Sequence, residues 1–210
     1  MRVSGCNSLA VRLTFVVALA LCVGGCGGGL GGLLGGSKPP PPTFDLLPPR
    51  GFAHLPRPPR GQLVVAEATA LPPFDSEKIV VRPDDSQLTA LEDAQWNDHL
   101  PRLVQTRIIQ TFENANRLRA VGRPSDRLTA DYQLLLDIRA FQIVIPGGPA
   151  AVVEISAKIV GDRSGRIAAA RVFRTSVPAA GADGPNAAAA LNDAFAHVAT
   201  DIVLWTARII

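Results

Sequence analysis

Three long β-type segments in the second half of the chain most strongly constrain its fold. They span residues 131–145, 150–160 and 165–177, and the turns between them are rich in glycine and other turn-forming residues. Glycine tolerates the positive φ angles that tight hairpins need. These lengths and turns predict an antiparallel meander.

Two stripes of apolar residues have the three- and four-residue spacing of a helix face. The first comprises Trp96, Leu100, Leu103, Val104, Ile108 and Phe112. The second comprises Ala187, Leu191, Ala194, Phe195, Val198, Ile202 and Trp205. For the first helix, Asn97 or Asp98 is a suitable N-cap, and Pro101 is compatible only with the first turn. We expect both helices to pack on the covered face of the sheet.

Shorter strands are predicted before the first helix, over residues 43–48, 61–70 and 77–83. A turn around Pro83–Asp85 indicates a hairpin. The predicted fold class is therefore α+β: a mainly antiparallel sheet with two helices packed on one face, in a single domain over residues 43–210.

The N-terminus has the pattern of a lipoprotein signal. Two arginines precede an apolar run over residues 13–23, which is too short for a membrane-spanning helix. Val23-Gly24-Gly25 before Cys26 resembles the bacterial lipobox, in which the cysteine is acylated. We therefore predict a signal peptide over residues 1–25 and lipidation at Cys26, so that a lipid anchors the mature N-terminus to a membrane.

Residues 26–42 are predicted to be a tether. Glycine dominates residues 27–36, and four prolines follow at 39–42, a composition typical of flexible and extended linkers. Gly27, rather than aspartate, after Cys26 favours sorting to the outer membrane, with the domain facing the periplasm.

Composition excludes several functions. All three cysteines lie at or before Cys26, so the domain has no disulfide and no catalytic thiol. Removal of residues 1–25 leaves 19 basic against 18 acidic residues, and no basic cluster with aromatics suggests binding to nucleic acid. The three histidines are scattered, so no metal site and no cofactor are expected.

One pair of acids, Asp137 and Glu154, resembles an acid and base pair on neighbouring strands. Because Arg139 and Lys158 lie beside them in the sequence pattern, we expect solvated cross-strand ion pairs instead. An enzyme is therefore not expected.

Several short motifs occur in an order that resembles a known family. They are Phe44-Asp45-Leu46, Pro73-Phe74-Asp75, Ile79-Val80-Val81-Arg82, Trp96 opening the first helix, and Asp131-Tyr132 with Leu134 and Phe141. Together, behind a lipobox, they resemble the ABC-type transport auxiliary lipoprotein family over about residues 43–208.

The resemblance implies a non-enzymatic accessory role in a transporter of the Mce type. In such systems an inner-membrane ABC transporter works with an Mce-type substrate-binding protein that bridges the periplasm. The small lipoprotein docks at the outer-membrane end, and phospholipid or another hydrophobic molecule passes between the membranes. By analogy, the domain is also a candidate for assembly into a homo-oligomeric ring.

Candidate contacts with a partner or lipid are apolar residues near the tether that we expect to be exposed. They are Phe52, Leu55, Leu71 and Phe74, together with the loop 178–186. Packing under a loop is the alternative for these residues. Trp96 and Trp205 are expected to anchor the helices in the core.

Two other functions stay open from the sequence. The chain could be an adaptor or structural lipoprotein of the envelope that binds another periplasmic complex. It could also be a periplasmic hydrolase that uses Asp137 and Glu154.

Overall fold

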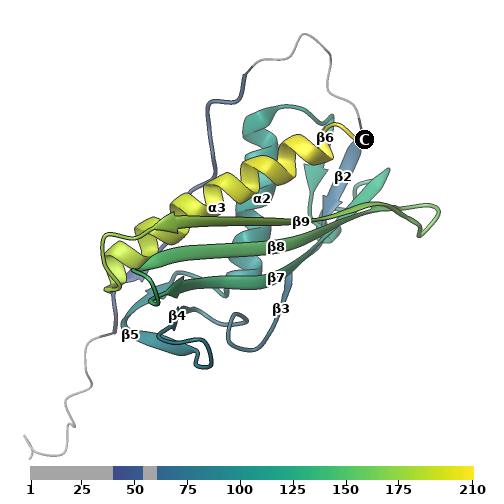
Figure 1. Cartoon of the computed structure of the whole chain (residues 1–210). Coiled ribbons are helices and arrows are strands. Elements are labelled where there is room, and N and C mark those ends of the chain that lie inside the picture. The colour runs from purple at the N-terminus through teal and green to yellow at the C-terminus, as the bar shows by residue number, and fades with distance from the viewer. Residues whose placement is uncertain (1–39, 54–60) are drawn as a thin grey trace, which may run out of the picture. The chain divides into compact units, whose positions relative to one another are not determined.

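A 13-residue strand, β7 (Tyr132–Val144), joins the two halves of a nine-stranded sheet (Figure 1). This computed structural model describes residues 40–53 and 61–210. On one edge, β7 pairs antiparallel with β8 (Ala150–Gly161), and β8 pairs antiparallel with β9 (Ile167–Pro178). The predicted meander of three long strands is confirmed.

The other edge of β7 carries three short strands in succession. These are β2 (Gln62–Val65), β3 (Thr69–Ala70) and β4 (Lys78–Arg82), and all three run parallel to β7. The expectation of a mainly antiparallel sheet is therefore wrong, because the sheet is mixed. Parallel neighbours need a long crossover connection, and the chain between β4 and β7 includes the helix α2 (Leu100–Ala115).

The remaining strands extend the sheet beyond β4 and β2. β5 (Thr89–Trp96) forms the predicted hairpin with β4, and β1 (Thr43–Phe44) pairs parallel with β5. β6 (Ala120–Gly122) pairs parallel with β2 and precedes a short 3₁₀ helix, η1 (Pro124–Asp126).

The strand predicted over residues 61–70 is two strands, β2 and β3. Pairing with β7 continues to Val65 and resumes at Thr69. Between them Ala68 is buried in the core. The pairing with β7 is therefore interrupted at the segment in which the small side chain of Ala68 packs into the core.

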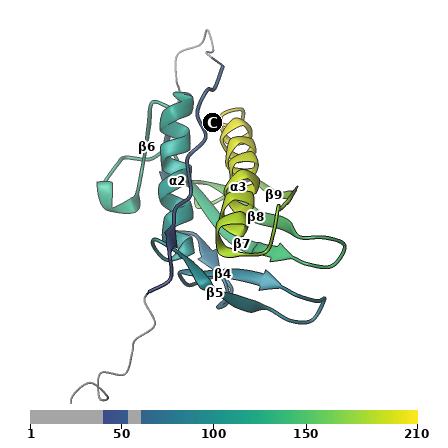
Figure 2. The same cartoon turned by 90° about the vertical axis from the view of Figure 1, so that its left-hand side faces the viewer.

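The two helices, α2 and α3 (Gly184–Thr206), lie side by side on one face of the sheet (Figure 2). α3 packs mainly over β8 and β9. The predicted stripes are buried from Leu100 to Phe112 and from Ala187 to Ile202, whereas Trp205 is half-buried. Burial of these stripes against the sheet forms the core, as expected for amphipathic helices.

α2 begins later than the sequence predicts. Trp96 is the last residue of β5, its backbone N–H donates to the carbonyl of Glu77 at 2.7 Å, and Asn97 N–H donates to Phe44 at 2.8 Å. This extended pairing excludes Asn97 as the N-cap, and the N-cap is His99 instead of Asn97 or Asp98. Pro101 does lie in the first turn, where its missing N–H leaves no helical bond unmade.

α3 begins within the segment predicted to be a loop. Its N-cap is Asp183, whose carboxylate accepts a hydrogen bond from the N–H of Asn186 at 3.3 Å. The next residue, Gly184, packs so closely on β5 that an added Cβ would lie 2.5 Å from the Cβ of Ala94. The absence of a side chain at Gly184 therefore permits the contact between helix and strand.

Three aromatic rings connect the sheet to α3. Phe141 of β7 makes an edge contact with Trp96 at a centroid distance of 5.8 Å. The ring of Phe195 lies 6.2 Å from that of Phe141. All three side chains are fully buried, so this cluster joins β5, β7 and α3.

Residues 43–53 form an N-terminal strap that makes polar contacts with both helices (Figure 2). Leu46 is buried, and Asp45 forms an ion pair with Arg107 of α2. The N–H of Leu47 donates to the side chain of Asn192 in α3 at 2.8 Å. Asn114 of α2 donates to the carbonyl of Pro49 at 2.9 Å. The strap is thus part of the folded domain.

We expect Phe141→Ala to lower the free energy of unfolding by about 3–5 kcal/mol, because it leaves a cavity between two aromatic rings. Denaturant-induced unfolding measures the loss. The matched control is Ile167→Ala at an exposed position, which should change stability by less than about 0.5 kcal/mol. Equal effects of the two substitutions would contradict the central role of the aromatic cluster.

Candidate functional site

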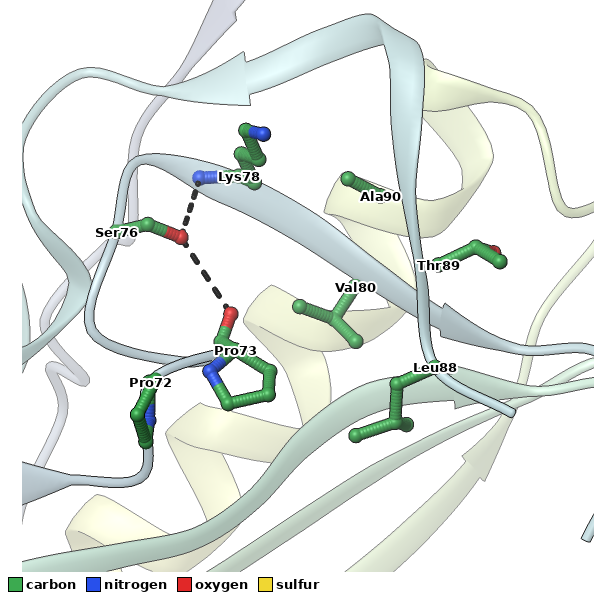
Figure 3. A pocket seen from close by; sticks show the side chains of 8 residues that line it. All are labelled: Pro72, Pro73, Ser76, Lys78, Val80, Leu88, Thr89 and Ala90. Atoms are coloured by element: carbon green, nitrogen blue, oxygen red, sulfur yellow. Dashed lines mark hydrogen bonds between the residues drawn. The ribbon is translucent and has the colours of Figure 1, made fainter. Parts of the chain in front are cut away.

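A pocket lies between the segment that follows β3 and the β4–β5 hairpin (Figure 3). Its volume is about 260 Å³. It is lined by Pro72, Pro73, Ser76, Lys78, Val80, Leu88, Thr89 and Ala90. The side chains of Pro73, Val80 and Leu88 surround the same space in Figure 3.

Two prolines form one wall because they cannot continue β3. Pro72 and Pro73 have no backbone N–H to donate, so the chain turns. The N–H groups of Phe74 and Asp75 both donate to the carbonyl of Leu71, at 2.8 and 3.0 Å. The Phe74 ring is buried in the core and holds this turn in place.

The opposite wall depends on the turn of the β4–β5 hairpin. The Asp84 carboxylate accepts hydrogen bonds from the N–H of Ser86 at 2.8 Å and that of Gln87 at 2.9 Å. It also accepts one from the Ser86 hydroxyl at 2.7 Å. These bonds close the turn, and Leu88 and Thr89 follow it into the pocket wall.

Five of the eight residues that line the pocket are apolar, and the hydroxyl groups of Ser76 and Thr89 are engaged in hydrogen bonds. The Ser76 hydroxyl donates to the carbonyl of Pro73 at 3.4 Å and accepts from the N–H of Lys78 at 3.3 Å. Among the residues that the structure describes, none forms an ion pair with the Lys78 ammonium group. The site can therefore hold an apolar group with a negative charge near Lys78.

The size of the pocket limits what it can hold. Sites for small-molecule ligands enclose about 300–1,000 Å³. At about 260 Å³, this pocket has room for one side chain or the end of one acyl chain, but not for a whole phospholipid.

The predicted contact residues occupy different environments. Leu71 is 62% exposed and precedes the pocket-lining Pro72. Phe52 is half-buried against the core, and Leu55 lies outside the described residues. The expectation that Phe74 is exposed is wrong, because only 3% of it is accessible and its ring anchors the turn. Contact with a partner or lipid stays a prediction for Phe52, Leu55 and Leu71.

Sequence reasoning missed the hairpin side of the pocket. Val80 and Ala90 are partners in the β4–β5 register, which sets them on the same face of the sheet. Leu88, a leucine in an otherwise polar turn sequence, was the one signal of an exposed apolar wall.

Asp137 and Glu154 are engaged with arginines on the exposed face of the sheet. Arg139 lies 3.5 Å from Asp137 and 4.0 Å from Glu154. Arg174 on β9 donates to Glu154 at 2.8 Å. The predicted cross-strand ion pairs are confirmed for Glu154, with Arg139 and Arg174 in place of Lys158, whereas Asp137 pairs with Arg139 of its own strand.

Residues 40–53 and 61–210 contain no cluster of three His, Cys, Asp or Glu side chains that could hold a metal ion. His99 lies 3.8 Å from the Asp75 carboxylate, and both groups are largely exposed. His54, and the predicted lipidation site Cys26, lie outside the described residues.

Within the part of the chain that the structure describes, no helix combines the length and the apolar character that crossing a membrane requires.

The sequence is similar to a known protein family and to a bacterial relative. The sequence model for the ABC-type transport auxiliary lipoprotein component matches residues 44–203. An uncharacterised protein of Bradyrhizobium diazoefficiens, bll6063, is 34% identical over 164 residues. These are 78% of this chain and 44% of that protein, so the chain spans less than half the length of this relative.

Solved structures share the fold. The crystal structure of XCC0632 from Xanthomonas campestris, of the DUF330 family, has a TM-score of 0.71 and 29% identity, covering 80% of this chain and 96% of that one. A crystal structure of an uncharacterised protein has a TM-score of 0.61 at 15% identity, covering 75% and 98%. The latter shows the fold alone.

The Asp84 turn gives a pH-dependent prediction. Hydrogen bonds from the side chain and then the N–H of Ser86 lower the pKa of Asp84 below its usual 3.8. Its stabilising effect is therefore present above pH 3.8 and is lost as the pH falls through the lower native pKa.

We expect Asp84→Ala to have a lower melting temperature than the unchanged protein near pH 7. The difference should shrink as the pH is lowered below 3.8, because the carboxylate becomes protonated in both states. Thermal unfolding across this range measures it. A difference that stays constant with pH would contradict a role for the ionised carboxylate.

Proposed function

Because the chain belongs to the ABC-type transport auxiliary lipoprotein component family, we propose that it is a non-enzymatic accessory lipoprotein of an Mce-type ABC transporter. In this role it helps to move phospholipid or another hydrophobic substrate between the inner and outer membranes. The observation that carries the proposal is the family match over residues 44–203, nearly the entire described domain.

The proposed anchor is the acylated Cys26. Residues 1–25 would be removed as a signal peptide, and residues 26–42 would tether the domain over residues 43–210 to the outer membrane, facing the periplasm. This arrangement is supported by the apolar run and small residues before Cys26 and by family membership. A single acyl chain binds a membrane only weakly, whereas multiple acyl chains anchor it stably.

The proposed docking site is the pocket of the β4–β5 hairpin. Leu88 is an exposed apolar residue of its lining, the exposed Leu71 precedes the lining residue Pro72, and Lys78 supplies a positive charge. An apolar side chain of the Mce-type protein would enter the pocket, as anchor residues do at protein interfaces. Phe52 and Leu55 complete the proposed contact set, and a homo-oligomeric ring would present several such pockets at once.

The first test is a crosslinked pull-down of the tagged protein from native membranes, with Cys26→Ala as the untethered control. We expect an Mce-type protein, its permease and its ATPase to be recovered, and less of each with the control. Recovery of cell-wall or secretion components alone would reject the transport proposal and favour an envelope adaptor.

A second test fills the pocket. Ala90 lines it and is exposed, so Ala90→Phe should leave stability within about 0.5 kcal/mol of the unchanged protein. We expect the affinity for the partner to fall at least about tenfold, since blocked anchor sites cost about 2 kcal/mol or more. Quantitative pull-down measures the change.

The matched control is Ala189→Phe, at an exposed position of α3. It adds the same ring at a site away from the hairpin and should leave partner recovery unchanged. Equal recovery with Ala90→Phe and the unchanged protein would show that the pocket is not the docking site.

A further inference from the structure

β9 presents a long sheet edge that no strand of the described chain covers. It pairs with β8 from Ile167 to Pro178 and with no other strand among the described residues. At about 3.4 Å per residue, its 12 residues span about 40 Å. The strand borders the sheet on the side of β8 (Figure 1).

This edge has few of the features that normally prevent pairing with another strand. Natural edges are protected by shortness, proline, bulges or charged side chains. β9 is long, its proline is the terminal Pro178, and its one register irregularity lies near Ile167. Ile167 is 59% exposed and Val172 44% exposed, so apolar side chains also reach solvent along it. The protection that remains is charge.

The charge on β9 has one sign. The strand contains Arg171 and Arg174 and no acidic residue. Arg171 lies over the ring of Phe173, 5.0 Å from its centroid, and forms no ion pair with any described residue. Arg174 is held by Glu154. The edge is therefore protected against basic strands but open to an acidic one.

A second copy of this chain matches the edge poorly. A second β9 would bring the same two arginines and no acidic residue to the edge, so pairing two copies gathers like charges without a neutralising partner. The strands at the far ends of the sheet order, β1 and β6, have only two and three residues. Neither can cover an edge of this length.

We infer that β9 is a strand-addition site, which takes an extended, acidic segment of a partner protein as a tenth strand of the sheet. Backbone hydrogen bonds along the edge provide affinity, and Arg171, which forms no ion pair with a described residue, selects for acidic side chains. This inference goes beyond the proposed function, because it does not depend on which envelope complex supplies the segment.

The test uses the full mature lipoprotein in detergent and a fluorescent 12-residue peptide of alternating threonine and glutamate. Fluorescence anisotropy measures binding, and hydrogen exchange reports where it occurs. We expect saturable binding and slower exchange of β9 amides. A lysine-for-glutamate peptide, and an acidic peptide N-methylated at alternate residues, should each bind at least about fivefold more weakly, because they lose charge attraction or backbone hydrogen bonds.

Arg171→Glu should also weaken binding roughly fivefold or more. Arg163→Glu is the matched control, since it makes the same charge change in the β8–β9 turn and should have little effect. Thermal unfolding and near-UV circular dichroism verify that both variants fold.

Three results would overturn the inference. The first is absence of binding by the acidic peptide to folded protein. The second is equal binding of the N-methylated peptide, which would show attraction by charge without strand addition. The third is a stable oligomer in sedimentation whose β9 amides are already protected and become exposed when dilution dissociates it, because a second copy would then occupy the edge.

Discussion

Hydrogen bonding along both edges of β7 is the constraint on which the rest of the structure depends. One edge is occupied by β8 over nearly its full length, and the other by β4, β3 and β2 in turn. Pairing on both edges satisfies the backbone N–H and C=O groups of β7. The helices α2 and α3 cover one face of the sheet. The cluster of Phe141, Trp96 and Phe195 lies at that covered face and joins strands distant in sequence to α3.

The two surfaces with a proposed role lie on opposite sides of β7. The pocket belongs to β4, β5 and the turn at Pro72–Pro73, whereas the free edge belongs to β9. Both are rigidly supported, the pocket by the buried Phe74 and the turn at Asp84, and the edge by its pairing with β8. Such an arrangement suits a protein that makes contacts with two partners or with two parts of one.

The strap over residues 43–53 connects the proposed tether to this scaffold. Its contacts with Arg107 and Asn114 of α2 and with Asn192 of α3 link the strap to both helices. Because Leu46 is buried in the core, the strap adds apolar burial as well as polar contacts. The strap therefore contributes to the stability of the domain.

The sequence by itself determined the elements whose signals are local. The period of the apolar residues identified α2, α3 and the meander of β7, β8 and β9, and the residues around Cys26 predicted a lipid anchor. Tertiary structure decided the direction in which β2, β3 and β4 pair with β7, the burial of Phe74, and the meeting of Pro73 with Leu88 across a pocket. These depend on which distant segment each residue meets, and neither periodicity nor turn composition carries that information, because strand direction and side-chain burial are set by non-local packing.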